Sequence, residues 1–162
     1  MKNRPFAVLF LCFALAFGGC AARVKTVTNL PPGVTQVQAQ NWDSAVQDLS
    51  TIANVTSTAR QTVIELNKSG LFPDGNNYAT TLEVLGKIDQ LQLSASTVLK
   101  QSPNNFNDST KAQIRDYMQQ ISAQILTLNT QGVTGIKDQT SLQKVNGLIA
   151  EITGAVALIL SF

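Results

Sequence analysis

Few side chains in this sequence belong to the types that carry out catalysis. Its 162 residues include no histidine and only two cysteines, so the commonest general base and the commonest transition-metal ligand are missing. The ten carboxylates are spread along the chain, without the facing glutamate pairs of a di-iron bundle. No glycine-rich phosphate loop occurs. We therefore expect no enzyme activity, no catalytic residues, no metal site and no cofactor.

Two weaker chemical hypotheses attach to a loop and to three aromatic residues. Residues 73–77 carry oxygen ligands of the kind that calcium takes, but a turn followed by a helix N-cap uses the same residue types, and we favour the turn. Trp42, Tyr78 and Tyr117 could line a pocket between helices. Aromatic side chains at helix ends more often close a bundle, so we expect that role for all three.

One of the two cysteines, Cys20, has informative surroundings. Lys2 and Arg4 precede an apolar core at residues 5–17, and the small residues Gly18 and Gly19 separate this core from Cys20. A positive start, a short apolar core and small residues are the order of a secretory signal peptide. The core is shorter than the roughly 20 apolar residues that a membrane span needs.

The ending Phe17-Gly18-Gly19-Cys20 resembles the lipobox of bacterial lipoproteins, with the departure that Phe17 stands where leucine is usual. The resemblance covers residues 1–20 only. It implies that residues 1–19 are a cleaved signal peptide and that the Cys20 thiol carries a diacylglycerol (a palmitate-type anchor). Several acyl chains attach a protein stably, whereas one binds only marginally. The alternative is an uncleaved N-terminal anchor over residues 5–22.

The same resemblance implies a location. Ala21 stands where an aspartate commonly marks inner-membrane retention in this class, so we expect a cell-envelope protein at the outer membrane, facing the periplasm. Removing 19 of the 162 residues leaves 143, enough for one domain. Losing Lys2 and Arg4 leaves ten basic and ten acidic residues, so no charge excess favours nucleic acid as a partner.

The mature chain divides into a leader and a helical domain. Residues 20–40 comprise the lipidated cysteine and a flexible tether, which lacks helical periodicity and holds Pro31-Pro32-Gly33. A coil of this length spans roughly 25 Å. The alternative is an extended strap whose valines pack onto the domain.

Residues 41–162 contain four segments with apolar residues at 3-4 spacing and none with sustained strand alternation. We expect helices from an N-cap at Asn41 to Gly70, from Asn76 or Asn77 to Gln101, from Asp108 to Gly132, and from an N-cap at Asp138 to the end. Short loops require antiparallel neighbours. The expected fold is an all-α, up-down-up-down four-helix bundle.

Three finer expectations concern positions within these helices. The second helix should bury Val84, Ile88, Leu91, Ala95 and Val98. Thr56, at a core position, should bond its own helix backbone while Arg60 extends outward. Residues 66–71 match residues 128–133, which leaves a duplicated αα-hairpin open, although two similarly capped helix ends would give the same match.

The fourth helix is the unusual one, because it carries a second stripe about 150° from its aliphatic stripe. This stripe of small residues, Gly147, Ala150, Gly154, Ala157 and Ser161, lets another helix backbone approach closely. With Leu158 it forms a candidate contact face. The alternatives are a neutral surface, a face covered by the tether, and membrane insertion of the helix end.

From these observations we expect a structural or interaction module. It would be an accessory subunit or an inhibitor of an envelope protein, contacting a protein partner or a second copy through the fourth helix. The alternative is a protein that binds or carries a small apolar ligand between its helices.

Overall fold

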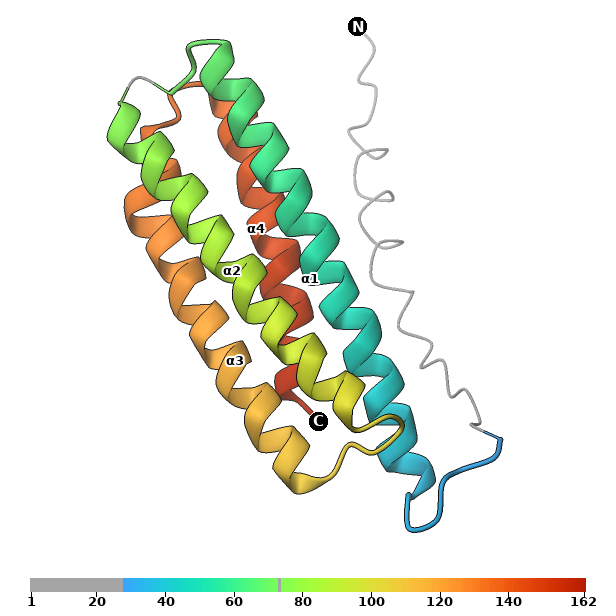
Figure 1. Ribbon diagram of the computed structural model, residues 1–162. Coiled ribbons are helices and arrows are strands. Elements are labelled where there is room, and N and C mark those ends of the chain that lie inside the picture. Colours follow the sequence, from blue (N-terminus) through green and yellow to red (C-terminus); the bar gives the residue numbers. More distant parts are fainter. Residues whose placement is uncertain (1–27, 73) are drawn as a thin grey trace, which may run out of the picture.

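The computed structural model describes residues 28–72 and 74–162, which form four long helices and no strand. The predicted signal peptide, Cys20 and the segment up to residue 27 lie outside the described residues. Figure 1 shows the helices side by side along one axis. The elements are α1 (Gln36–Lys68), α2 (Gly75–Gln101), α3 (Asp108–Thr127), a π-helical turn η1 (Leu128–Gly132), a 3-10 turn η2 (Val133–Gly135) and α4 (Gln139–Leu160).

The expected all-α bundle is confirmed. Successive helices run in opposite directions, and α1 packs against α2 and α4 while α3 packs against the same two helices (Figure 1). The pairs α1–α3 and α2–α4 are therefore diagonal. One end of the bundle holds the N-terminal ends of α1 and α3 and the C-terminal ends of α2 and α4 (Figure 1).

A continuous apolar core joins the four helices. Each contributes one isoleucine with no exposed surface: Ile52, Ile88, Ile121 and Ile152. Burying such a side chain contributes about 1.5–3 kcal/mol. The ends of the bundle are closed by edge-to-face aromatic pairs, Phe72 with Tyr78 and Phe106 with Phe162, at centroid distances of 5.8 and 5.9 Å.

The first helix begins earlier than the sequence suggested. Its N-cap is Thr35 rather than Asn41, because Thr35 and Gln38 form a capping box in which each side chain bonds the other's backbone N–H. Ala39 is fully buried. Residues 36–40, assigned to the flexible tether, therefore belong to α1.

The buried stripe of α2 also differs from the expected one. Gln92 is buried in the interface with α1, while Leu91 and Val98 are half-buried. The Gln92 side-chain amide donates to Leu49 O at 3.1 Å and to Ser96 Oγ at 2.9 Å. These bonds satisfy the amide and allow a polar residue to occupy a position that hydropathy alone gives to leucine.

The expectation for Thr56 is wrong, because its hydroxyl is fully buried and has no hydrogen-bond partner among the described residues. An unbonded buried hydroxyl is destabilising by about 1–3 kcal/mol. Arg60 does extend outward, and it forms an ion pair with Asp89 of α2 at 2.9 Å.

The two helix ends that look alike in the sequence have different conformations. Gly70 has φ +72°, and Leu71 N–H donates to Leu66 O at 3.0 Å, so the predicted helix end at Gly70 is a left-handed cap. Gly132 has φ −86° and lies in the π-helical turn. The local match between these segments is thus one of sequence and not of cap geometry.

Candidate functional site

Helix α4 is positioned by its N-terminal cap and its aliphatic stripe. The Asp138 carboxylate accepts bonds from Ser141 Oγ at 2.6 Å and Ser141 N at 2.8 Å. The hydroxyl bond, with the backbone bond second, lowers the pKa of Asp138 below its usual value. Val145, Ile149 and Ile152 then anchor the helix in the core.

The opposite side of α4 is uncovered. All six residues of the contact face, Gly147, Ala150, Gly154, Ala157, Leu158 and Ser161, are exposed. Leu158 keeps 54% of its surface accessible, although leucine is a residue type that normally lies inside. The structure therefore places the six residues together on one solvent-facing side of one helix.

Nothing in the described residues fills the space above the two glycines of this face. Apart from its chain neighbours and the adjoining backbone of α4 itself, a Cβ atom built on Gly147 or Gly154 meets no atom of residues 28–72 or 74–162 within 4 Å. In the part of the chain that the structure describes, the leader segment therefore does not lie on these two glycines. The small side chains leave room that the bundle itself does not use.

The composition of α4 sets it apart from its neighbours. Among the described residues it is the one helix long and apolar enough to cross a membrane, by length and composition only, yet just 33% of its most apolar 18-residue segment is buried. Its charged residues are Lys144 and Glu151. A helix with one packing face normally carries charged or polar residues on its other faces, so the apolar character of the remaining surface of α4 is unusual.

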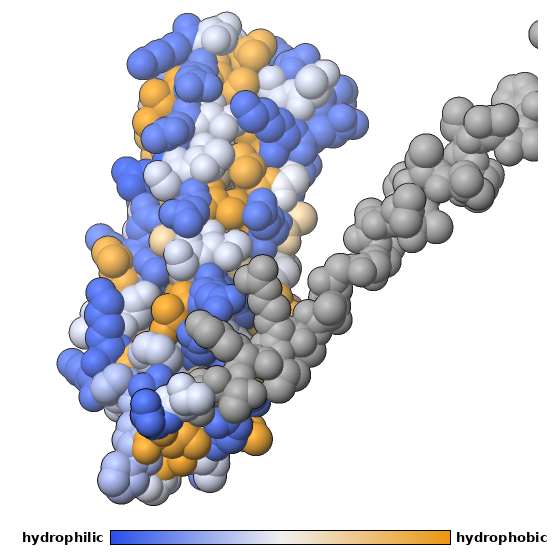
Figure 2. All heavy atoms as spheres, turned by 90° about the vertical axis from the view of Figure 1, so that its right-hand side faces the viewer, coloured by the Kyte–Doolittle hydropathy of each residue, from blue (hydrophilic) through white to orange (hydrophobic). Residues whose placement is uncertain are grey.

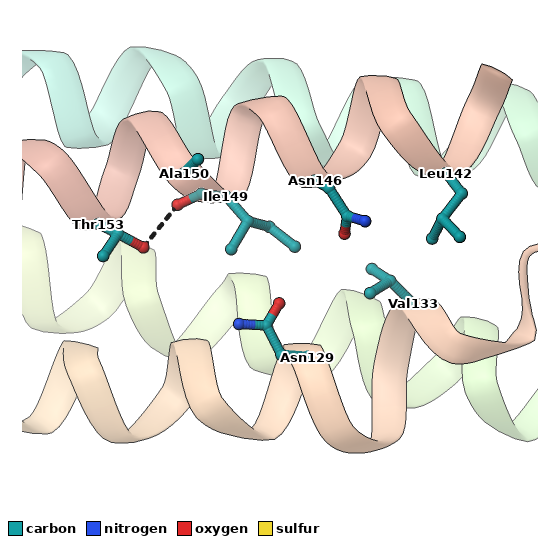
Figure 3. A pocket seen from close by; sticks show the side chains of 7 residues that line it. All are labelled: Asn129, Val133, Leu142, Asn146, Ile149, Ala150 and Thr153. Carbon is teal, nitrogen blue, oxygen red and sulfur yellow. Dashed lines mark hydrogen bonds between the residues drawn. The ribbon is translucent and has the colours of Figure 1, made fainter. Parts of the chain in front are cut away.

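A groove runs beside this face, between α4 and the turn that follows α3 (Figure 3). Its volume is about 510 Å³, and it is lined by Asn129, Val133, Leu142, Asn146, Ile149, Ala150 and Thr153. Figure 3 shows Asn129 approaching from the opposite side to Asn146, while the Thr153 hydroxyl is occupied by its bond to Ile149 O at 2.8 Å. Ala150 belongs to both the groove and the contact face.

The groove was not expected from the sequence. Asn129 and Asn146 lie on segments far apart in the chain, and each was an unremarkable polar residue on its own helix. The feature that marks the groove is structural: α3 gives way to a π-helical turn at Leu128, before Gly132, where the sequence pattern predicts the helix end. Such turns occur often at functional sites.

The other candidate residues have structural positions. Asp74, from the loop considered for calcium, is the N-cap of α2 and accepts from Asn76 N at 2.9 Å. Within residues 28–72 and 74–162 no three His, Cys, Asp or Glu side chains gather where they could hold a metal ion. Tyr78 packs on Phe72 and Tyr117 packs against the core, whereas Trp42 borders a hollow between α1 and α2.

The side of the molecule where α1 lies has a different surface. Figure 2 shows mostly polar residues there, with apolar patches that are small and separated. Such scattered apolar residues are ordinary for a protein surface and mark no interface. Comparison with known proteins supplies no further assignment: no family model, no curated protein and no solved structure matches this chain.

Proposed function

We propose that this chain is a lipid-anchored cell-envelope protein, attached through Cys20 at the outer membrane and facing the periplasm, that acts by contact rather than by catalysis. Its contact face is the exposed side of α4. The partner is an envelope protein or a second copy of the chain, and the role is that of an accessory subunit or an inhibitor.

The observation that carries this proposal is the uncovered side of the most apolar helix. Exposing apolar surface and two helix-interior glycines, Gly147 and Gly154, is unfavourable for an isolated bundle. The same features are favourable where another helix backbone approaches, because small residues allow close packing. A partner on this side would explain both.

The fold makes the face compatible with the proposed anchor. Helix α1 begins 16 residues after Cys20, a separation of at most about 55 Å when fully extended. Helix α4 ends at the same end of the bundle as the start of α1 (Figure 1). Ala157, Leu158 and Ser161 are therefore at the end of the bundle that the anchor would hold near the membrane.

Two measurements test the anchor and the face separately. Cys20→Ser should abolish palmitate labelling and processing at this site, and labelling that persists in the variant would contradict the anchor. A photocrosslinking residue at Ala157 should give a discrete adduct in intact envelopes. The same group at Gln90, exposed on α2, is the matched control, and equal adducts at both positions would contradict the face.

The second candidate, a carrier of a small apolar ligand, gains one specific observation. The core is filled by a continuous cluster of buried side chains, so a ligand would not sit in its centre. A small hollow does lie between α1 and α2 beside Trp42.

A further inference from the structure

The hollow beside Trp42 shares no residue with the α4 face and lies between α1 and α2. Its volume is about 210 Å³, and it is lined by Trp42, Val46, Leu49, Ser96, Leu99 and Lys100. A cavity of about 150 Å³ accommodates benzene. The hollow therefore has room for one ring or one short hydrocarbon chain, but not for the paired chains of a membrane lipid.

The polar atoms of its walls are already occupied. Trp42 Nε1 donates to Leu99 O at 3.0 Å. Gln92 Nε2 donates to Leu49 O and to Ser96 Oγ, at 3.1 and 2.9 Å. Because these groups bond one another, an occupant meets a hydrocarbon surface and needs no hydrogen-bonding groups in its buried part.

One charged group, Lys100, borders the hollow, and it has no ion-pair partner among residues 28–72 and 74–162. Lys100 is exposed in the last turn of α2. The ion pairs among the described residues are Arg60–Asp89 and Lys87–Glu83, so the Lys100 ammonium is unpaired there. A lysine stem can lie along apolar surface while its charge stays in water, which places a positive charge at the mouth of an apolar hollow.

We propose that this hollow binds a small single-chain amphiphile with a carboxylate head. The hydrocarbon part would fill the space between Trp42, Val46 and Leu99, and the carboxylate would pair with the ammonium of Lys100. The small volume of the hollow admits one short chain, its apolar lining favours a hydrocarbon, and the unpaired ammonium of Lys100 favours an anionic head. The site is independent of the proposed α4 contact and of the anchor.

The test uses the fluorescence of Trp42, the single tryptophan of the chain. The full mature chain carrying Cys20→Ser, and therefore no lipid, is titrated with octanoate below its micelle concentration. A saturable change in emission is expected. Neutral 1-octanol should bind about fivefold more weakly, since an exposed ion pair contributes up to about a factor of five, and acetate should give no change.

Three variants locate the site. Lys100→Gln should weaken octanoate about fivefold and leave 1-octanol unchanged, whereas Lys144→Gln, on α4, should change neither. Val46→Phe should abolish both by filling the space, with circular dichroism confirming that it folds.

Three results would overturn the proposal. They are no saturable octanoate response in the wild-type protein, equal effects of Lys100→Gln and Lys144→Gln, and a Trp42 response to phosphatidylglycerol vesicles but none to octanoate. The last result would identify a membrane surface contact in place of a bound single chain. Because no vesicle, anchor or partner is needed for the octanoate titration, its failure would leave the proposed contact through α4 and the proposed anchor untouched.

Discussion

Replacing Gly132 by alanine tests whether the π-helical turn exists to bring η1 against α2. A Cβ atom at Gly132 would lie 2.8 Å from Thr81 Oγ1 and 3.4 Å from Leu128 Cδ2. Thr81 is fully buried, and its hydroxyl donates to Asn77 O at 2.7 Å. Because Thr81 is buried and its hydroxyl is bonded, relieving this contact requires a shift of its side chain or of the two segments.

The size of the effect follows from two opposing contributions. Overpacking a tight site destabilises by about 1–3 kcal/mol, and exchanging glycine for alanine in a helical segment returns up to about 1 kcal/mol. We expect a net loss of about 1–2 kcal/mol in unfolding free energy. For a chain of this size that lowers Tm by about 3–10 °C.

Gly154→Ala and Gly86→Ala are the matched controls, because a Cβ at either glycine meets nothing within 4 Å. Both should stabilise by up to about 1 kcal/mol, giving a change of opposite sign in the same thermal unfolding assay. The double variant Gly132→Ala/Thr81→Ala should lose less than the sum of its single variants, because removing Oγ1 opens the space. A stabilised Gly132→Ala protein, or strict additivity in the double variant, would refute the reasoning.

Two further predictions concern buried polar groups. Thr56→Val should raise the unfolding free energy by about 1 kcal/mol, because it removes an unbonded buried hydroxyl. Thr81→Val should lower the unfolding free energy by a similar amount, because it removes a bonded hydroxyl. Equal effects of the two variants in urea unfolding would contradict this. Burial raises the pKa of Asp48 above 3.8, so ionised Asp48 opposes folding and its contribution to stability falls as pH rises from 3.8 through the raised pKa. Asp48→Asn should therefore be more stable than the wild type at pH 7 and equal to it below pH 3.8, as measured by urea unfolding at the two pH values.

The main features of the bundle were predictable because they depend on hydrophobic spacing. The apolar stripes of α3 and α4 are buried, except that Leu142 is half-buried, because no polar residue interrupts either stripe. The Asp138 cap and the Gly70 cap were equally predictable, because both are set by contacts within a few residues of the chain.

The failures at Gln92 and Gly132 depend on contacts between segments, whereas the missed cap at Thr35 depends on residues of the same turn. Gln92 is buried because Leu49 O and Ser96 Oγ happen to lie within reach, and hydropathy does not register such partners. The cap predicted from the sequence is Asn41, although Gln38, three residues after Thr35, completes a capping box with it. The sequence pattern predicts that Gly132 ends the third helix, whereas in the structure the lack of a side chain at Gly132 allows Thr81 to pack against it.

The candidate site was predictable in part. The six residues of the contact face follow from helical periodicity alone, and their exposure agrees with the sequence pattern. The groove beside them depends on where α3 ends relative to α4, as does the approach of Asn129 toward Asn146 (Figure 3). No single-helix pattern contains that information.

The most direct test of the proposed contact face is the association of Gly154→Leu, compared with Gly86→Leu. Both exchanges place a leucine at a helix-interior glycine with open space at its Cβ, but only Gly154 lies on the contact face. Sedimentation of the Cys20→Ser chain, alone and with envelope extract, measures self-association and partner capture. We predict that Gly154→Leu loses association at equal or higher Tm while Gly86→Leu retains it. A wild-type protein that stays monomeric and captures nothing, or equal association of the two variants, would contradict the account.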